Sequence, residues 1–367
     1  MPQTNGVVSL YLKDFRSYGE LVLDTRAQII VITGENGRGK TNLLEAVSLL
    51  SPSKGIRKAK TTDLPKFGSK SWGVSAGVLH SIHGDLQFGV GDLGEETPKK
   101  IIRMNGETLK THQDIGKMIT QLWLTPAMDR FVVDAPSGRR EFIDHIGWTF
   151  NLEHATHIST YEHAMKERSK LLKDGVRDKI WLESLEKTIA QMGVAIVSWR
   201  ETVLVLLKKI IAELLIPSGF PRFELNFEGD IETLIQNKSA LEAEAFFQEK
   251  LGLSRELDAI KGGSSMGPHR SDLSFLFCPK NTPGYLCSTG EQKILILGLV
   301  LSSIKLLELK SQGVPLLLLD EVIAHLDPIY RRILFDQIKN LKVQTWMTGI
   351  DIKDFQDLRS HSIYFSP

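Results

Sequence analysis

The sequence predicts an α/β fold with a second, mainly helical lobe. Residues Gly34 to Thr41 read Gly-Glu-Asn-Gly-Arg-Gly-Lys-Thr, the G-x-x-x-x-G-K-[ST] pattern of a phosphate-binding loop, and the apolar run Ile29–Ile32 precedes them. Far downstream, the apolar run Leu316–Leu319 leads directly into two carboxylates. From Thr125 to about Ile216, apolar and charged residues recur at spacings of three and four with few glycines, which is typical of helices.

The composition is that of a soluble globular protein large enough for two lobes. The chain has 367 residues, of which 42% are hydrophobic and 24% are charged. We expect an ATPase lobe made of residues 1–122 and 310–367, and a mainly helical lobe made of residues 123–309. The 45 basic and 44 acidic residues nearly cancel, so that any contact with DNA must come from a local patch.

Membrane and disulfide signals are missing. Cys278 and Cys287 are too few for a metal cage, so we expect reduced thiols and a cytoplasmic protein. The N-terminus lacks a basic stretch followed by an apolar one, and thus no secretion signal is expected. Lysine and glutamate interrupt the most apolar stretches, Thr202–Ile216 and Ile294–Leu307, which favours buried helices over membrane spans.

The remaining elements follow in order along the chain. The first part is rich in strands, and Asn105-Gly106 between apolar segments predicts a hairpin turn. Pro217 to Pro221 ends the helical block. The predicted strands are Val7–Leu12, Leu21–Leu23, Ile29–Ile32, short segments within 72–109, Phe223–Phe227 and Leu273–Phe277; a helical stretch is predicted at Ile231–Leu251 and a loop at Gly262–Ser265.

The phosphate loop predicts a site for ATP and Mg²⁺. Glycines allow consecutive backbone N–H groups to surround phosphates, and the following helix directs the positive end of its dipole at them. Lys40 is expected to reach the β- and γ-phosphates and to act in catalysis, while the Thr41 hydroxyl holds Mg²⁺. The predicted nucleotide contacts of this segment are Gly34, Glu35, Asn36, Gly37, Arg38, Gly39, Lys40, Thr41 and Asn42.

The downstream carboxylates complete this site. An apolar strand that ends in Asp320-Glu321 is a Walker B pattern. Asp320 is expected to bind Mg²⁺ through its hydration shell, and Glu321 to act as the general base toward the attacking water.

Three further segments resemble motifs of ABC-type ATPases. Ser288-Thr-Gly290-Glu-Gln292 opens an apolar helix, Lys293 to about Leu307, as the signature motif does. Ser288, Gly290 and Gln292 are then expected to bind the γ-phosphate held by a partner subunit, although Ser288 with Glu291 also fits a simple capping box.

The other two segments follow the Walker B pattern. Ala324-His-Leu-Asp327-Pro is similar to a D-loop, in which Asp327 contacts nucleotide, and Asp327 before proline also reads as a helix N-cap. His325 is not expected to be catalytic. Thr345–Gly349 resembles the strand and switch that end the ATPase core, with Thr348 where many relatives carry a histidine that senses the γ-phosphate.

The motif blocks together resemble the RecF family of bacterial DNA replication and repair ATPases. The blocks are Leu12-Lys-Asp-Phe-Arg-Ser-Tyr18, Gly34 to Ala46, Leu124-Thr-Pro126, Ser137-Gly-Arg-Arg-Glu-Phe-Ile-Asp144 and Gly267-Pro-His-Arg-Ser-Asp272. Asp320-Glu321 departs from the two aspartates of many RecF sequences, and residues 145–260 carry little that matches.

The resemblance implies an ABC/SMC-like ATPase head, a P-loop NTPase with an inserted helical lobe and no long coiled coil. Such a protein dimerises head to tail with ATP, binds DNA at single-strand gaps and duplex junctions, and works with RecR and RecO to help RecA replace single-strand binding protein. Its ATP hydrolysis is weak and serves DNA release. Arg16 is then a nucleotide contact, with solvation at the surface as the alternative.

Two basic runs are candidate DNA contacts. Lys54, Arg57, Lys58 and Lys60 follow the phosphate-loop helix, and Lys166, Arg168, Lys170 and Lys173 lie in one helical stretch. Either run could bind duplex backbone phosphates. The alternative function is another ABC/SMC-type ATPase with a non-DNA client, such as a transporter ATPase subunit, or an ATP-binding module without turnover.

Overall fold

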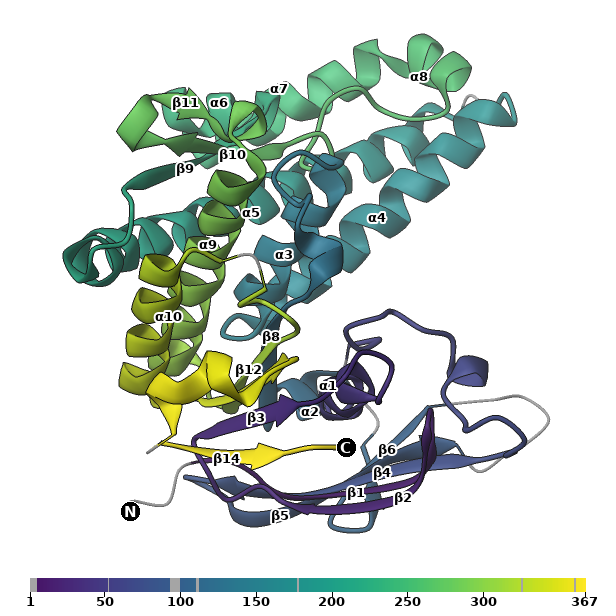
Figure 1. Cartoon of the computed structure of the whole chain (residues 1–367). Coiled ribbons are helices and arrows are strands. Elements are labelled where there is room, and N and C mark those ends of the chain that lie inside the picture. Colours follow the sequence, from purple (N-terminus) through teal and green to yellow (C-terminus); the bar gives the residue numbers. More distant parts are fainter. Residues whose placement is uncertain are drawn as a thin grey trace. The chain divides into compact units, whose positions relative to one another are not determined.

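The computed structural model describes residues 5–51, 53–92, 100–109, 112–176, 178–324, 326–359 and 361–367. The chain divides into two compact units (Figure 1). Unit 1 comprises Met1–Asp129, Leu214–Phe220 and Ile296–Pro367, and unit 2 comprises Arg130–Glu213 and Pro221–Leu295. These bounds differ from the lobes expected at 122/123 and 309/310. The first expected boundary falls inside strand β8 (Ile119–Leu124), which pairs along its length with another strand of unit 1.

Unit 1 contains an antiparallel sheet of six strands in the order β2-β1-β4-β5-β6-β7. The predicted hairpin at Asn105-Gly106 is confirmed: Met104 pairs with Glu107, and the φ angles of the two turn residues are 51° and 88°. Positive φ at both central positions is what a type I′ two-residue hairpin turn requires. The strands are β1 (Gly6–Phe15), β2 (Tyr18–Asp24), β4 (Trp72–His80), β5 (Gly84–Asp92), β6 (Ile101–Met104) and β7 (Glu107–Thr108).

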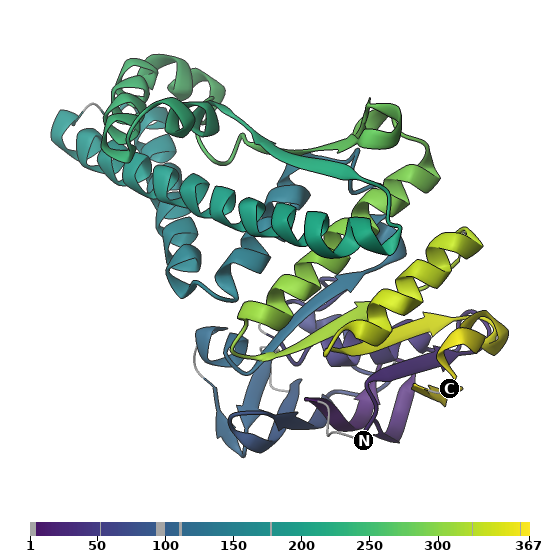
Figure 2. The same ribbon diagram turned by 90° about the vertical axis from the view of Figure 1, so that its left-hand side faces the viewer.

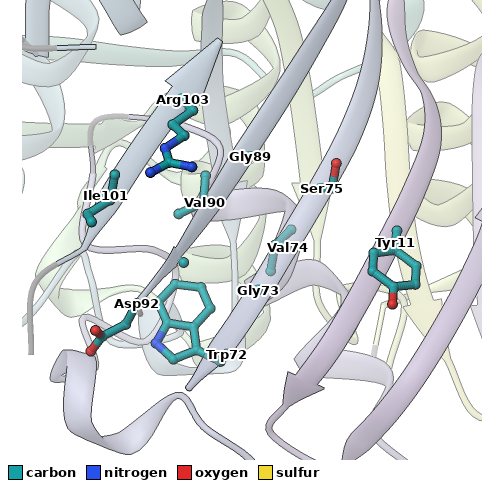
Figure 3. Close-up of a pocket in the computed structure, with 11 residues that line it drawn as sticks. Tyr11, Trp72, Gly73, Val74, Ser75, Gly89, Val90, Asp92, Ile101 and Arg103 are labelled. Atoms are coloured by element: carbon teal, nitrogen blue, oxygen red, sulfur yellow. The ribbon is translucent and has the colours of Figure 1, made fainter. Parts of the chain in front are cut away.

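Small residues at facing positions of β4 and β5 leave a hollow of about 250 Å³ in this sheet (Figure 3). Gly73 pairs with Gly91, and Ser75 pairs with Gly89, so that the middle of the surface carries almost no side chain. A Cβ on Gly91 would lie 2.6 Å from the Trp72 carbonyl oxygen, which explains why glycine is required there. The larger lining side chains are Tyr11, Trp72, Val74, Val90, Asp92, Ile101 and Arg103.

The second sheet of unit 1 is parallel, in the order β14-β3-β13-β12-β8. Burial does not alternate along its central strands, as expected for strands covered on both faces, and every residue of β3 and of β13 is buried. The carboxyl ends of parallel strands meet at one edge, where ligands bind in open α/β sheets. The strands are β3 (Ile29–Thr33), β8, β12 (Val314–Leu319), β13 (Gln344–Gly349) and β14 (Ser362–Phe365).

One hydrophobic core joins the two sheets of unit 1. It combines the inward side chains of the antiparallel sheet with helix α1 (Lys40–Ser48) and one face of the parallel sheet. Figure 1 shows α1 beside β3 and above the antiparallel sheet. The other helices of this unit are α2 (His112–Gly116), α10 (Pro328–Asn340) and the later part of α9 (Thr289–Lys310).

Unit 2 is built on a pair of long helices, α4 (Leu152–Lys173) and α5 (Lys179–Ile210), which pack side by side (Figure 2). Together with α6 and α7 they enclose a separate core. A small antiparallel sheet has the order β11-β10-β9. The other elements are α3 (Pro136–Trp148), β9 (Phe223–Glu228), α6 (Asp230–Asn237), α7 (Ala240–Leu253), α8 (Arg255–Lys261), β10 (Asp272–Phe277) and β11 (Thr282–Pro283).

The helical stretch predicted at Ile231–Leu251 is two helices rather than one. Ser239 begins α7 with a capping box, in which its hydroxyl accepts from the Glu242 N–H and the Glu242 carboxylate accepts from the Ser239 N–H. This arrangement ends α6 and starts a new helix. Ser239-Ala-Leu-Glu242 is a capping-box sequence that indicates a helix start, but the continuous apolar periodicity of this stretch suggested a single helix.

Two further predictions can be compared with the described residues. In the part that the structure describes, no helix combines the length and the apolarity needed to cross a membrane. Cys278 and Cys287 are both free thiols, as expected, and burial raises the pKa of each.

Candidate nucleotide-binding site

The phosphate loop connects β3 to α1, as the sequence predicts. Gly34, Gly37 and Gly39 have φ angles of 153°, 85° and 93°, a region that side-chain-bearing residues rarely adopt. Gly39 is required for a second reason, because a Cβ there would lie 2.7 Å from the Tyr18 hydroxyl oxygen. No side chain caps the N-terminus of α1. Its first N–H groups are therefore suited to an anion.

Tyr18 fixes the turn into this helix. Its hydroxyl donates to the Gly39 carbonyl oxygen at 3.1 Å. Burial raises the pKa of Tyr18 to about 12, and the phenol therefore keeps its proton and remains a donor. Tyr18 belongs to the block Leu12 to Tyr18, for which the sequence alone offered no such role.

Lys40 lies inside the loop rather than in solvent. Its ammonium donates to the carbonyl oxygens of Gly34 at 2.7 Å and Glu35 at 3.0 Å, and to the Asn36 side-chain oxygen at 3.3 Å. Lys40 is only 3% exposed, whereas residues 35–38 are exposed. Arg38 makes a surface pair with Glu35 at 3.5 Å. The positive charge is thus held at the centre of the loop by weak neutral acceptors.

Thr41 and Asp320 meet at the carboxyl edge of the parallel sheet. The Thr41 hydroxyl lies 3.0 and 3.1 Å from the two carboxylate oxygens of Asp320, which is 5% exposed. A hydroxyl and a carboxylate are oxygen ligands of the kind that Mg²⁺ prefers, and Mg²⁺ usually takes its other ligands from water and phosphate. The two residues fit the metal role predicted for them.

Glu321 follows with an unusual backbone. Its φ angle is 51°, in the left-handed region. Its N–H donates to the Thr348 hydroxyl at 2.9 Å, and that hydroxyl donates to Asp320 Oδ1 at 2.7 Å. The structure therefore brings Thr41, Asp320, Glu321 and Thr348 together, although Thr348 comes from a different strand.

Arg16 lies in the turn between β1 and β2 and contacts the phosphate-loop helix α1 through the Glu45 carboxylate. Its Nε and Nη2 atoms donate to the two oxygens of Glu45 at 2.9 and 2.6 Å. The same carboxylate accepts from Arg57 at 3.1 Å, and Arg57 also donates to the Asn42 side-chain oxygen at 2.7 Å. Asn42 donates in turn to Ser17. The sequence did not reveal that Glu45, at 1% exposure, holds both arginines.

The signature segment lies in unit 2. Ser288 forms the predicted capping box: its N–H donates to Glu291 Oε2 at 2.8 Å, and its hydroxyl accepts from the Glu291 N–H at 3.4 Å. Hydrogen bonds from Lys280 and Ser288 lower the pKa of Glu291 to about 2. Gln292 is buried and donates to the Cys287 carbonyl oxygen at 2.9 Å. Gly290 is exposed, with open space where a Cβ would lie.

Asp327 is the N-cap of α10, as its sequence context predicts. Its carboxylate accepts from the Ile329 N–H at 2.8 Å, and the residue is exposed. His325 lies outside the described residues.

Two of the sequence blocks prove to be partners in unit 2. Arg139 donates to both carboxylate oxygens of Asp272, at 2.7 and 2.9 Å, and Arg140 donates to the Ser271 carbonyl oxygen at 2.6 Å. Asp144 accepts two hydrogen bonds from Arg200. Burial alone would raise the pKa of Asp144, but the hydrogen bonds from Arg200 and His154 hold it below its usual value. These blocks position each other.

One candidate DNA contact is inaccessible. Arg168 is 1% exposed and is paired with Glu186 at 3.0 Å and Asp258 at 2.8 Å, so it cannot reach a phosphate backbone. Lys166, Lys170 and Lys173 of the same run are exposed. In the other run Lys54, Arg57, Lys58 and Lys60 are all exposed.

Comparison with known proteins identifies the family. The model of the RecF/RecN/SMC N-terminal domain matches residues 6–362. A "DNA replication and repair protein RecF" of Mesorhizobium japonicum is 37% identical over the whole chain and 97% of its own length. A protein of the same name from Rhizobium johnstonii is 38% identical over the whole chain and 98% of its own length.

The chain belongs to the RecF family. Its fold is also similar to that of a solved "recombination mediator protein RecF-ATP in RecFOR pathway", with a TM-score of 0.84 at 24% identity over 96% of this chain and 94% of that one. An SMC head domain bound to part of ScpA gives a TM-score of 0.53 at 16% identity over 95% and 90% of the two chains. The predicted SMC-like ATPase head is thereby confirmed as the fold.

Proposed function

We propose that this RecF-family protein is a weak ATPase that binds gapped or junction DNA as an ATP-induced dimer in replication and recombinational repair. The observation that carries the ATPase part is the contact of Thr41 with Asp320 beside a complete phosphate loop. Residues 279 positions apart are brought within hydrogen-bond distance at the edge where α/β sheets bind ligands.

The chain's own groups would divide the chemistry as follows. The loop N–H groups and Lys40 bind the phosphates, and Lys40 exchanges its carbonyl acceptors for phosphate oxygens, which are stronger acceptors because they are charged. Thr41 and Asp320 would hold Mg²⁺, which when bound neutralises charge on the phosphates. Glu321 accepts a proton from the water that attacks the γ-phosphorus, and ADP leaves.

A second subunit would complete the site. Ser288 and Gly290 are exposed at the N-terminus of a long helix, where an anion is favoured, and a phosphate loop is already present in the same chain. This supports a head-to-tail dimer in which the signature segment of one subunit binds the γ-phosphate of the other. Gln292 would stabilise this segment through its hydrogen bond to the Cys287 carbonyl oxygen. Asp327 would lie at the interface between the two subunits.

Membership of the RecF family supports the proposed partners. One solved relative is described as a mediator in the RecFOR pathway, which supports RecO and RecR as partners and the loading of RecA in place of single-strand binding protein as the task. The exposed run Lys54, Arg57, Lys58 and Lys60 is the better candidate for duplex backbone, since all four side chains are accessible.

Fluorescence anisotropy tests this function. The protein is titrated onto a gapped duplex and a blunt duplex of equal length, with ATP and Mg²⁺ and without nucleotide. We expect binding that requires ATP and is at least as tight on the gapped DNA, and that weakens steeply with salt. Absence of ATP-dependent binding to either duplex would refute the DNA part and leave an ATPase with another client.

A further inference from the structure

Thr348 occupies a position that sheet geometry determines. It lies near the end of β13, between the phosphate-loop strand β3 and the strand β12 that carries Asp320. The register pairs Thr348 with Ile32 and Met347 with Leu319. The side chain is 1% exposed. The Thr348 side chain is therefore buried at the carboxyl edge of the parallel sheet.

The Thr348 hydroxyl forms hydrogen bonds to both of the residues that follow β12. It donates its only proton to Asp320 Oδ1 at 2.7 Å and accepts from the Glu321 N–H at 2.9 Å. A hydroxyl has one proton and two lone pairs, so both bonds form at once without competition. The proton that a γ-phosphate sensor would offer to the nucleotide is thus already used within the same chain.

Each of these bonds stabilises an arrangement that is otherwise unfavourable. Glu321 adopts a φ of 51°, which costs free energy for a residue with a Cβ and persists only where its surroundings enforce it. The bond to Thr348 fixes the N–H of that residue. Asp320 is a buried carboxylate, and Thr348 and Thr41 are the hydroxyl donors that satisfy it.

We propose that Thr348 is a positioning residue for ATP hydrolysis, which sets the direction of the Asp320 carboxylate and holds the Glu321 backbone in its left-handed conformation. It does so through one hydroxyl, without contact to the nucleotide. The catalytic consequence rests on the proposed function, because it assumes that Glu321 is the general base. The structural part, the protection of the Glu321 amide, does not depend on that assumption.

The test uses two changes at Thr348 and one matched control in the full-length protein. Thr348→Val keeps the shape and removes the hydroxyl, while Thr348→Ser keeps the hydroxyl. Thr345→Val removes another fully buried hydroxyl from the same strand, one whose partner is the Val343 carbonyl oxygen at 3.5 Å. All three are compared with wild type by hydrogen–deuterium exchange of the peptide around Glu321 and by single-turnover hydrolysis of Mg²⁺-ATP.

The expected pattern separates positioning from a general loss of packing. In Thr348→Val, the Glu321 amide hydrogen should exchange at least about 10-fold faster than in wild type, and ATP hydrolysis should be slower by on the order of 100-fold. Nucleotide affinity should stay within about threefold, since loop and helix contacts remain. Thr348→Ser and Thr345→Val should remain within about threefold of wild type in both measurements.

The exchange measurement decides the structural part of the proposal independently of the assignment of Glu321 as the general base. Wild-type exchange and hydrolysis in Thr348→Val would overturn it, and so would equal losses in Thr345→Val. Glu321→Gln is measured in parallel: if that variant hydrolyses ATP as fast as wild type, the general-base role fails, while the exchange data still decide whether Thr348 holds this backbone.

Discussion

Glu45 is the buried carboxylate on which two arginines beside the phosphate loop depend, and its replacement gives a sharp test of the site. Its side chain is 1% exposed, and that of Arg16 is 19% exposed. Glu45→Ala would leave the largely buried Arg16 guanidinium without its counter-ion. Breaking a buried pair by removing one partner costs about 3–5 kcal/mol, whereas Glu45→Gln, which keeps an acceptor and the shape, should cost about 1–3 kcal/mol.

The two arginines should differ in their contributions. Arg57 is 42% exposed, and its pair with Glu45 is a surface interaction worth about 0–1 kcal/mol. We therefore expect Arg57→Ala to change stability little and Arg16→Met to cost several times more. Asp336→Asn is the control, since Asp336 is 57% exposed and pairs with Lys339 at the surface.

Urea unfolding followed by circular dichroism measures these differences, with ATP affinity as the second readout. The order of stability should be wild type and Asp336→Asn, then Arg57→Ala, then Glu45→Gln, then Glu45→Ala. A Glu45→Ala protein within about 0.5 kcal/mol of wild type would show that the pair is not desolvated in solution, and the reasoning from burial would be refuted.

Three further predictions concern the nucleotide, the dimer and pH. Lys40→Ala should lose most of its ATP affinity in a fluorescent-nucleotide titration, because the loop then lacks its central cation; retained affinity would contradict this role. Ser288→Arg should bind ATP normally but fail to dimerise with ATP in light scattering, because in the proposed dimer Ser288 binds the partner's nucleotide; normal dimerisation would refute the head-to-tail model. Burial lowers the pKa of Lys100 from 10.5 to about 8, so the unfolded chain binds more protons between these values and stability should rise with pH there. One pKa unit corresponds to about 1.4 kcal/mol, so from pH 8 to pH 10.5 the free energy of unfolding of the wild type should rise by at most about 3 kcal/mol relative to Lys100→Met. Thermal unfolding at several pH values measures this difference. Parallel stability profiles of the two proteins would contradict the lowered pKa of Lys100.

Local patterns were sufficient where the chemistry is local. The phosphate loop, the hairpin at Asn105-Gly106 and the cap at Asp327 depend on glycine, turn and capping residues within a few positions, and the structure shows each where it was predicted. The ends of β3 and β12 were likewise readable from their apolar runs.

Ion pairs and hydrogen bonds between residues far apart in the chain could not be predicted from local sequence patterns. Arg168 looked like part of a basic run, but it shares the helical face of Tyr161, Ala164 and Leu171, all of which are buried. That spacing was a signal that Arg168 points inward. Its partner Asp258 lies 90 positions away, however, and no local pattern indicates such a pair. The same is true of Thr348, whose role depends on strand order.

The order of strands in the parallel sheet also governs when the protein can become active during its synthesis. The phosphate loop is made before β12, but the strand that lies between β3 and β12 in the sheet is β13, which is made after both of them. Until it inserts, β3 lacks a neighbour on that side and Asp320 lacks the hydroxyl of Thr348. Contacts across such separations form slowly because the loop must close first. A nascent chain thus contains both the phosphate loop and Asp320 before β13 is made, and only with β13 can it complete the contacts among Thr41, Asp320 and Thr348.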